Sequence, residues 1–523
     1  MSSANTAMSE YSPALSFRGH MGRISRQSSV FFAGTLFSVG SAYFFKIYLA
    51  RVLGAEGLGA YTLGMTLISF LGVFNALGLP QAAVRFVAVY SATGKDSHLH
   101  AFLGGSVALL LLSNTALGAV LLLAGPWVVT HFYRTPSLSR YLPLFGALML
   151  LGCLTTFFGQ VLAGFKDVTR RTVITNFVGN PLTMVLSVAL IAGGLGLRGY
   201  LVAQAASAVA VLILLVISIR KMAPARGESF QGVGSEVRSA VFSLSAAFLG
   251  VGILEFLLSQ VDKVLIGFWL DARAVGVYAV ATAIVSFVPV ALQSVNQIFS
   301  PTIADLHARG ATEMLGRLFQ TLTKWILALT LPLAAVVIVF AAPLMGIFGR
   351  EFESGWPILV IGVIGQLVNC GVGSVGYLLL MSGHQYRLVK VQAAMAAVMI
   401  GVSLLLIPWL GIAGAAIAAA ITNVASNLWY LKEVRATLKI SPYNRSYLQM
   451  LAPIAVMVSA VFLMKSPILA MRPFWLAFLL ALAAAYAIFL SVMLTLGLNA
   501  DDRLVVSSIW AKVRGTAVCA EAA

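Results

Sequence analysis

Residues 53–70 read LGAEGLGAYTLGMTLISF, and residues 270–287 read LDARAVGVYAVATAIVSF. At a constant offset of 217 positions, six of the eighteen residue pairs are identical. The same offset aligns Lys46 with Lys263, and both lysines stand inside long apolar stretches. Weak internal similarity of this kind is typical of membrane proteins built from repeated units. We therefore predict that the chain contains two copies of one structural unit.

The composition indicates that these units lie in a membrane. Of the 523 residues, 60% are hydrophobic and only 10% are charged, whereas a soluble domain is about 25% charged. A helix needs about 20 apolar residues to cross the hydrocarbon of a bilayer, and the chain has about fourteen runs of this kind. We predict an all-α polytopic membrane protein. The expected spans are residues 28–50, 60–80, 101–124, 141–164, 172–192, 199–219, 240–269, 276–298, 323–348, 357–381, 390–409, 411–431, 449–468 and 473–497.

The repeat groups these spans into two six-helix lobes with two extra C-terminal helices. Because six is an even number, the lobes share one orientation and are related by an axis along the membrane normal, as in many transporters. The first span is expected to be retained, because Lys46 and Arg51 stand where a cleaved signal peptide would end. The expected segments are 1–27 (cytoplasmic N-terminal segment), 28–219 (N-terminal lobe), 220–239 (cytoplasmic linker), 240–431 (C-terminal lobe), 449–497 (extra helices) and 498–523 (cytoplasmic tail).

The basic residues predict the orientation of the chain. Of the 34 lysines and arginines, 24 fall in or next to the connections on the side that holds both termini, eight fall on the other side, and the remaining two, Lys46 and Lys263, lie well inside spans. Cytoplasmic loops are rich in lysine and arginine, so both termini are expected to be cytoplasmic. The net charge of +17 then reflects topology. We expect no nucleic-acid partner, because no loop gathers a basic block with interleaved aromatic residues.

The sequence contains no pattern typical of a cofactor or a metal site. Cys153, Cys370 and Cys519 are far apart, with no CxxC pair or His/Cys cluster, which predicts neither a disulfide framework nor a metal centre. No glycine-rich phosphate loop interrupts the cytoplasmic connections, so direct use of ATP is not expected.

The seventh span contains three charged residues, Glu255, Asp262 and Lys263. A charge at the centre of a membrane helix costs about 2.5–3.5 kcal/mol, so such residues usually face a bundle interior or an aqueous cavity. Glu255, Ser259 and Asp262 share one helix face, and the repeat places Lys46 at a comparable depth. One interpretation is a hydrated cavity between the lobes that contacts a polar, anionic headgroup. In the other, the lysines extend to the membrane surface and Asp262 neutralises a lysine.

The eighth span offers amide side chains at helical spacing, Gln293, Asn296 and Gln297. They are suited either to bonding substrate hydroxyls or to bonding a neighbouring helix. Pro289 and Pro301 are candidate hinges in this span. The remaining amides in spans are interpreted mainly as packing contacts; they are Gln160, Asn176, Asn180, Gln204, Gln366, Asn369, Asn423 and Asn427.

Arg85 follows Pro80 at the end of the second span. If that span continues as a helix, Arg85 lies at the cytoplasmic mouth of the cavity, and Pro80 is a further candidate hinge. The general excess of basic residues on the cytoplasmic side explains Arg85 equally well.

The run YLARVLGAEGLGAYTLGMTLISFLGVFNALGLPQAAVRFVA resembles the first two spans of bacterial polysaccharide-export flippases, of the multidrug/oligosaccharidyl-lipid/polysaccharide exporter superfamily. The resemblance continues in VDKVLIGFWLDARAVGVYAVA, FSPTIADLHARG, LLLMSGHQYRLVKVQ and LLLIPWLGIAGAAIAAAIT, and so covers residues 28 to 431. It implies two lobes in a V around a central cavity, in the cell inner membrane. It also implies that charged cavity residues hold the pyrophosphate and sugars of a lipid-linked saccharide. Here the corresponding spans offer Lys46, Glu255, Asp262 and Lys263, and the two acids depart from an all-cationic cavity.

The function that this resemblance implies is the transfer of a polyprenyl-pyrophosphate-linked saccharide from the cytoplasmic to the outer leaflet by alternating access. The expected partners are that substrate, membrane lipid and a coupling ion, either a proton or sodium. Glu255 or Asp262 would titrate, since a carboxyl group in a low-dielectric setting releases its proton less readily than in water.

Two other functions remain open. A drug/cation antiporter of the same superfamily would rely on the acidic residues alone. A membrane polysaccharide polymerase or ligase would need a sizeable outer loop, but the longest outer connection, residues 125–140, is short and has no carboxylate; we therefore expect a protein that is not an enzyme. Residues 501–515 are either an interfacial helix anchored by Trp510 or a disordered end.

Overall fold

The computed structural model describes residues 13–222, 235–471 and 473–495, and it contains helices without a β-strand in those ranges. This confirms the predicted all-α class. The chain divides into two compact units, Met1–Phe256 and Leu257–Ala523. Outside the described residues lie most of the predicted linker and the whole predicted tail 498–523, which includes Cys519 and the segment 501–515 with its two open alternatives. The bounds of the predicted lobes stay a prediction.

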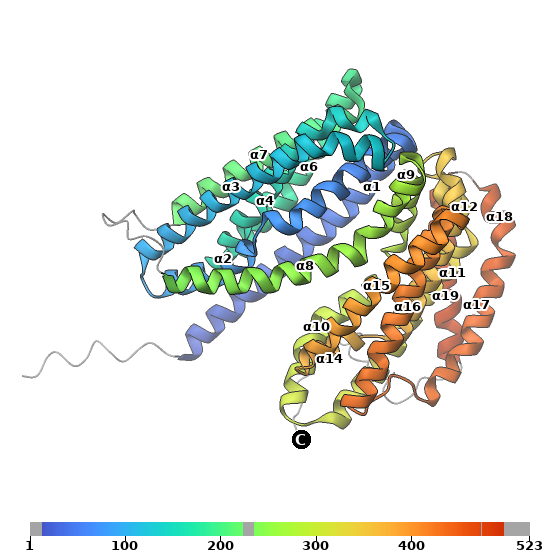
Figure 1. Cartoon of the computed structure of the whole chain (residues 1–523). Helices are drawn as coiled ribbons and strands as arrows, with labels where there is room; N and C mark the ends of the chain where they lie inside the picture. Colours follow the sequence, from blue (N-terminus) through green and yellow to red (C-terminus); the bar gives the residue numbers. More distant parts are fainter. Residues whose placement is uncertain (1–12, 223–234, 472, 496–523) are drawn as a thin grey trace, which may run out of the picture. The chain divides into compact units, whose positions relative to one another are not determined.

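The N-terminal unit is built from seven α-helices with short π- and 3₁₀-helical connections, and a further helix continues from it into the second unit (Figure 1). The α-helices are α1 (Pro13–Asn75), α2 (Leu79–Ala92), α3 (Asp96–Trp127), α4 (Leu142–Gly164), α5 (Val168–Thr172), α6 (Asn180–Leu190), α7 (Gly196–Met222) and the shared α8 (Ser235–Trp269). The π-helices are η1 (Val128–Phe132), η3 (Val173–Gly179) and η4 (Ile191–Leu195), and η2 (Pro136–Tyr141) is a 3₁₀-helix.

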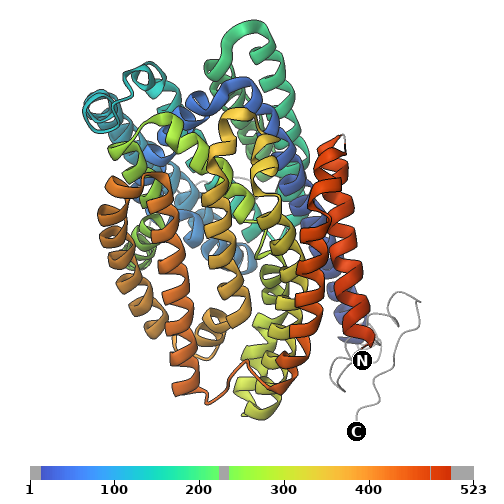
Figure 2. The same ribbon diagram turned by 90° about the vertical axis from the view of Figure 1, so that its right-hand side faces the viewer.

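The C-terminal unit contains the remaining helices. They are α9 (Ala272–Val285), α10 (Val290–Ala308), α11 (Thr312–Val339), α12 (Ala341–Gly346), η5 (Arg350–Gly355), α13 (Trp356–Val372), α14 (Val375–Met381), α15 (Gln385–Leu410), α16 (Ile412–Thr437), η6 (Arg445–Met450), α17 (Leu451–Leu463), α18 (Lys465–Ala470) and α19 (Phe474–Thr495). The C-terminal helices α17 and α19, red in Figures 1 and 2, lie side by side and both pack on α11. The Tyr486 hydroxyl donates to the Leu329 carbonyl across this contact at 2.6 Å.

The helices have the length and polarity of a multi-pass membrane protein. Within the described residues, nine helical stretches are long and apolar enough to cross a bilayer, and the pair α9–α10 brings the number to as many as ten. One of the nine, Val168–Met222, contains two of the predicted spans. Large apolar side chains such as Leu123, Trp409 and Leu463 are about 80% exposed, as expected when the surrounding solvent is lipid.

Breaks in the helices correct one expected boundary and one expected hinge. The helix α1 runs through the first expected span and most of the second across a kink at Gly54 (φ 69°, ψ 179°), and it ends at Asn75. The second span was therefore predicted to end too late, at residue 80. Pro80 lies in the first turn of α2, where its missing N–H costs nothing, so it begins a helix and does not kink one.

The eighth span is bent next to Pro289, one of its two candidate hinges. Helices α9 and α10 meet at 53°, and Pro289 is the residue that precedes α10. Pro301, the other candidate hinge, lies inside α10, which continues through it. Because of this break, α10, which carries the amide residues, runs in a different direction from α9.

The backbone repeats its turns at nearly the same offset as the sequence. Left-handed residues recur in pairs separated by 215 to 217 positions: Gly94 and Gly310 (φ 64° and 69°), Lys166 and Gly383 (62° and 83°), and Gly196 and Gly411 (50° and 59°). The last pair also shares ψ values of −132° and −137°. The kink at Gly54 corresponds to Asp271, which separates α8 from α9. These matches support the internal duplication independently of side-chain identity.

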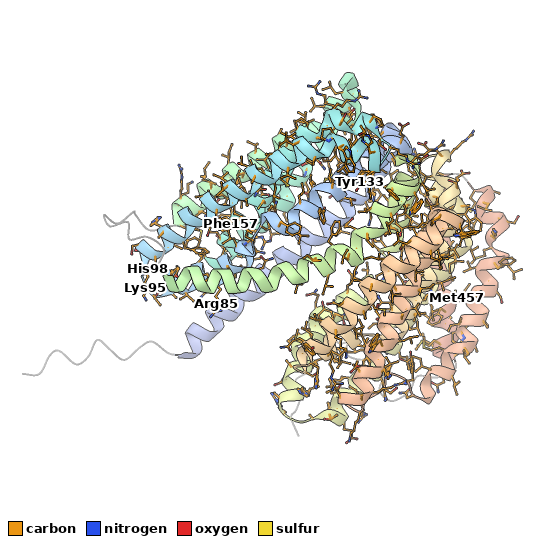
Figure 3. The ribbon with its side chains drawn as sticks, in the orientation of Figure 1. Arg85, Lys95, His98, Tyr133, Phe157 and Met457 are labelled. Atoms are coloured by element: carbon orange, nitrogen blue, oxygen red, sulfur yellow. The ribbon has the colours of Figure 1, made fainter. Side chains whose placement is uncertain are left out.

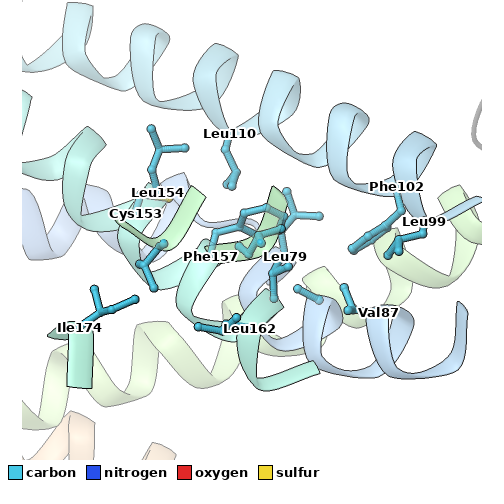
Figure 4. Close-up of a cluster of buried hydrophobic side chains, with 14 of the residues drawn as sticks. Leu79, Val87, Leu99, Phe102, Leu110, Cys153, Leu154, Phe157, Leu162 and Ile174 are labelled. Atoms are coloured by element: carbon cyan, nitrogen blue, oxygen red, sulfur yellow. The ribbon is translucent and has the colours of Figure 1, made fainter. Parts of the chain in front are cut away.

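Each unit has its own apolar core. In the N-terminal unit, buried residues of α2, α3 and α4 surround Phe157, which is fully buried, and Ile174 and Leu215 extend the cluster to η3 and α7 (Figure 4). In the C-terminal unit, one cluster joins α10, α11, α14 and α16, and a second joins α11 to α17 and α19. These cores hold the helices whose polar faces line the cavities below.

Candidate functional site

Lys46 lines a cavity inside the N-terminal unit. This Lys46 cavity has a volume of about 500 Å³ and is bounded by α1, α4, α6 and α7. Lys46 is partly buried, and Asn180 and Gln204 supply amide groups from α6 and α7. Gln204 donates to the hydroxyl of Tyr61 at 2.9 Å, which orients one polar group in the wall. The structure thus places a cation among neutral polar side chains.

A second cavity, of about 330 Å³, adjoins the first and contains Arg171. The two share the wall residues Asn180, Thr183, Gln204 and Ala208. Arg171 is partly buried and donates from Nη1 to Oε1 of Gln160 at 3.1 Å. Gly159 makes room for the guanidinium, since a Cβ there would come within 3.3 Å of Arg171 Nε.

The local chain geometry explains the position of Arg171. Asp167 precedes α5 and accepts a hydrogen bond from the Arg170 backbone N–H at 3.0 Å. After α5 the chain continues as the π-helix η3, a wider turn that often occurs at functional sites. Thr175, in η3, lines the same cavity as Arg171. Neither N-terminal cavity is lined by an aspartate or a glutamate, so both have positive character.

Sequence reasoning missed Arg171, because it stands in a polar connection and was counted only as a topological signal. No feature of the connection itself distinguishes Arg171 from Arg170, whose side chain pairs with Asp167 at 3.3 Å. Lys324, assigned to the cytoplasmic side by the same count, is only 3% exposed within α11.

In the C-terminal unit, Asp262 is part of a compact hydrogen-bonded group. Asp262 is 7% exposed and accepts from the Tyr278 hydroxyl at 2.8 Å. Lys263 donates to Asp262 Oδ1 from its backbone N–H at 2.8 Å and from Nζ at 3.3 Å, and Nζ also reaches the Ser259 carbonyl at 2.7 Å. Asp262 is therefore paired with a neighbouring lysine, as in the interpretation in which Asp262 neutralises a lysine. Asp262 lines a small cavity of about 190 Å³ beside Tyr278.

A larger cavity of the C-terminal unit is lined by neutral polar groups. This amide cavity has a volume of about 580 Å³ and no charged side chain among its lining residues. It shares Gln366, Ala419 and Asn423 with the small Asp262 cavity. Its amide side chains include Gln293, Asn296, Gln366, Gln392, Asn423 and Asn427.

The three predicted amides of α10 have different surroundings. Gln293 is exposed and lines the amide cavity, and Asn296 lines it while being 7% exposed. Gln297 is exposed and lines none of the cavities described above. Amides interpreted mainly as packing contacts also line cavities; they are Asn180 and Gln204 in the N-terminal unit and Gln366, Asn369, Asn423 and Asn427 in the C-terminal unit.

Glu255 and Arg85 are not part of these cavities. Both side chains are exposed, Glu255 on α8 and Arg85 on α2. Arg85 lies at the same end of the N-terminal unit as Lys95 and His98, and Tyr133 lies at the opposite end (Figure 3). Among the described residues, no three His, Cys, Asp or Glu side chains come together in a way that could hold a metal ion.

Two family profiles match parts of this chain. The sequence profile of the family described as polysaccharide biosynthesis protein matches residues 24–307, more than half of the chain. The MatE profile matches residues 247–370. A search of curated proteins gave no significant match.

Three solved structures illustrate the similarity of fold. The lipid II flippase MurJ, in an inward closed conformation, aligns with a TM-score of 0.71 at 15% identity, over 92% of this chain and 99% of MurJ. An inward-facing multidrug resistance MATE family transporter of the MOP superfamily aligns with a TM-score of 0.63 at 16% identity, over 78% of this chain and 95% of the transporter. A mutant of the Vibrio cholerae MATE transporter VcmN aligns with a TM-score of 0.55 at 18% identity, over 80% of this chain and 99% of VcmN.

At these identities the solved structures establish the fold alone, whereas the profile match establishes the family. The fold was predicted from the apolar spans and from the internal repeat, and the solved structures agree with it. The chain belongs to the polysaccharide biosynthesis protein family and has a fold like that of MurJ and the MATE transporters.

Proposed function

We propose that this protein is a flippase for a polyprenyl-pyrophosphate-linked saccharide, such as a polysaccharide or O-antigen repeat unit. It would move the headgroup from the cytoplasmic to the outer leaflet of the cell inner membrane, with both termini cytoplasmic. The observation that carries the proposal is the pair of adjoining cavities in the N-terminal unit, which contain Lys46 and Arg171 and are lined by no acidic side chain.

The chemistry of these cavities suits a diphosphate. A guanidinium has five N–H donors in a planar fork that matches phosphate oxygens, and the structure shows Arg171 using one nitrogen on Gln160. Charge attraction is several times stronger beside low-dielectric walls than in water. In this proposal Lys46 and Arg171 bind the phosphates, and neutral groups such as Thr175 and Gln204 contact the remaining oxygens.

The transport step in this proposal is alternating access. The polyprenyl chain stays in lipid while the headgroup enters from the cytoplasmic side, and rocking of the two lobes then opens the site outward. A gradient of protons or sodium would supply the energy, with Asp262 or Glu255 as the responding carboxylate. Binding a cation at Asp262 would weaken its attraction for Lys263, 3.3 Å away, and so couple the gradient to a change of local structure.

The proposal is tested by reconstitution into liposomes with fluorescent undecaprenyl-pyrophosphoryl-N-acetylglucosamine. The rate at which the sugar becomes accessible to an impermeant reagent is measured for the wild type, Lys46→Ala, Arg171→Ala and the control Arg85→Ala. Each cavity variant is expected to slow transfer at least about tenfold, the effect of losing ~1.4 kcal/mol, while Arg85→Ala retains the wild-type rate. Transfer no faster than in protein-free liposomes would refute the function, and equal rates in all variants would refute the site.

A drug/cation antiporter is the second candidate, because the MatE profile covers the region of Asp262. Such a transporter would move a cationic dye in exchange for an ion and would lose activity in Asp262→Asn. The basic side chains of the N-terminal cavities favour the flippase, since they repel a cation. Dye uptake by the same liposomes, measured beside lipid transfer, separates the two functions.

An enzymatic role as a polymerase or ligase has less support. MurJ and the MATE proteins aligned above are a flippase and transporters by name. We therefore propose transport without bond-making or bond-breaking on the saccharide.

A further inference from the structure

The amide cavity of the C-terminal unit has chemistry that a diphosphate does not require. Its volume of about 580 Å³ lies within the range of about 300–1,000 Å³ typical of small-molecule sites. Its wall is formed by five helices, α10, α13, α14, α15 and α16, together with Leu258 of α8. Side-chain amides and hydroxyls project from several of these helices into one space, so the polar groups converge on a common volume.

Several of these amides have hydrogen-bonding capacity that the protein does not use. Asn296 is 7% exposed, and its Oδ1 atom has no partner within the part of the chain that the structure describes. Gln366 accepts a hydrogen bond from Asn369 at 2.9 Å but donates none to the described residues. Gln293 and Gln392 form no side-chain hydrogen bond with a described residue. Because buried polar groups are normally paired, the Oδ1 atom of Asn296 is an acceptor available to a ligand group that enters the cavity.

The polarity of the cavity restricts the charge of that ligand. No lining residue carries a charge, so an ionised carboxylate or amine entering the cavity would lose its water without gaining a counter-ion. Asp262 borders the adjoining small cavity, but its carboxylate is already bonded to Tyr278 and Lys263. The cavity therefore favours a neutral ligand over an anion or a cation.

A ligand with hydroxyl and amide groups matches this wall. A side-chain amide presents a donor and an acceptor together, which complements a sugar hydroxyl or an N-acetyl group. We propose that the amide cavity binds an uncharged sugar of the lipid-linked substrate, rich in hydroxyl or N-acetyl groups and without a uronate or a free amine. This inference rests on the proposed function and adds the chemical class of the saccharide. In it, Gln293, Asn296 and Gln366 form hydrogen bonds with the sugar.

The test compares three fluorescent undecaprenyl-pyrophosphate lipids in reconstituted liposomes. One carries a neutral N-acetylhexosamine oligosaccharide, one carries the same oligosaccharide with a uronate, and one carries no sugar. The wild type is expected to transfer the neutral lipid about tenfold faster than the uronate lipid. Gln293→Leu is expected to slow the neutral lipid about three- to tenfold, the effect of losing one hydrogen bond, and to leave the sugar-free lipid unchanged.

A matched control lies on the same helix. Gln297 is also an exposed glutamine of α10, one turn from Gln293, but it does not line the amide cavity, so Gln297→Leu should behave as the wild type. Equal transfer of the neutral and uronate lipids, or equal effects of the two variants, would overturn the inference and leave the flippase function standing.

A binding measurement keeps the inference testable if no lipid is transferred and the proposed function fails. Saturation-transfer NMR with the free neutral oligosaccharide and detergent-solubilised protein should give contacts in the wild type and in Gln297→Leu. These contacts should weaken in Gln293→Leu and in Gln366→Leu. Absence of a signal in the wild type, or a signal unchanged in both cavity variants, would refute the sugar site itself.

Discussion

The two units use one repeated scaffold with different polar chemistry. At the offset of 217 positions, Lys46 corresponds to Lys263, and Phe45 corresponds to Asp262. In the C-terminal unit the lysine is paired with the carboxylate beside it at 3.3 Å, whereas in the N-terminal unit an aromatic ring takes that position and the lysine lines a cavity. One residue therefore decides whether the repeated lysine is neutralised by its chain neighbour.

The corresponding tyrosines show the same divergence. Tyr278 donates to the carboxylate of Asp262 at 2.8 Å, whereas Tyr61 accepts from the neutral amide of Gln204 at 2.9 Å. Duplication thus preserved the positions of the polar groups and changed their partners. The comparison teaches that the fold can keep its turns and helix breaks while the polar side chains of each unit acquire different partners.

The largest expected effect comes from breaking the charged group of the C-terminal unit. Asp262→Asn leaves Lys263 without its carboxylate, and loss of a largely buried ion pair partner costs about 3 kcal/mol. The free energy of unfolding, measured by denaturant titration in detergent micelles, should fall by this amount.

The double variant Asp262→Asn/Lys263→Met is the control, because it removes both charges. It should recover most of the loss. A double variant as unstable as the single one would show that the pair is not the source of the stability.

The second effect tests a difference in packing between the units. Gly64 corresponds to Ala281, and a Cβ at Gly64 would lie 2.1 Å from the buried ring of Phe145. Gly64→Ala should therefore destabilise the protein by about 2–3 kcal/mol, the cost of overpacking a core. The measurement is thermal unfolding in detergent.

Gly72→Ala is the matched control on the same helix, because no atom lies within 4 Å of the added methyl group. It should leave stability unchanged or raise it by up to about 1 kcal/mol. If Gly64→Ala and Gly72→Ala behave alike, the close contact between α1 and α4 is refuted.

A smaller effect separates the two tyrosines. Tyr278→Phe removes a hydrogen bond to a charged group and should cost about 2 kcal/mol, whereas Tyr61→Phe removes a neutral one and should cost about 1 kcal/mol. Equilibrium unfolding of both variants provides the comparison. Equal losses, or a larger loss at Tyr61, would contradict the stronger role assigned to the Asp262 group.

The last prediction concerns a variant that makes the N-terminal unit more like the C-terminal unit. Phe45→Asp gives Lys46 the acidic neighbour that Lys263 has, so the Lys46 cavity should lose part of its attraction for phosphate. Transfer of undecaprenyl-pyrophosphoryl-N-acetylglucosamine should slow about tenfold, equivalent to ~1.4 kcal/mol. Phe45→Asn removes the ring without adding charge, and a loss of the same size in that variant would show that shape, and not charge, is responsible.

Much of the architecture could be predicted from the sequence. Apolar run length predicted the helices, and a repeat as weak as that between residues 53–70 and 270–287 predicted turns that recur in the backbone. Pro289 predicted the bend in the eighth span, because proline cannot donate the hydrogen bond that a continuous helix needs. The end of the second span was misplaced, because residues 76–80 remain apolar while the chain turns at Leu77 and Gly78.

The candidate site was only partly predictable. Lys46 and Asp262, which line cavities, were candidates because charges in apolar spans are costly and therefore conspicuous. Arg171 was missed because it stands in a polar connection, where an arginine is ordinary. The amides Gln366 and Asn423 were interpreted mainly as packing contacts because a single helix shows only which face they occupy.

Sequence alone was enough to determine that this protein lies in a membrane, that it is helical and that it contains an internal duplication. Each of these features depends on local composition or on similarity along the chain. Only the tertiary structure decided which polar side chains share a cavity and which of them are already paired. The physical reason is that lipid, a neighbouring helix and a cavity can all accommodate the same helix face, and contacts between helices distant in sequence select among them.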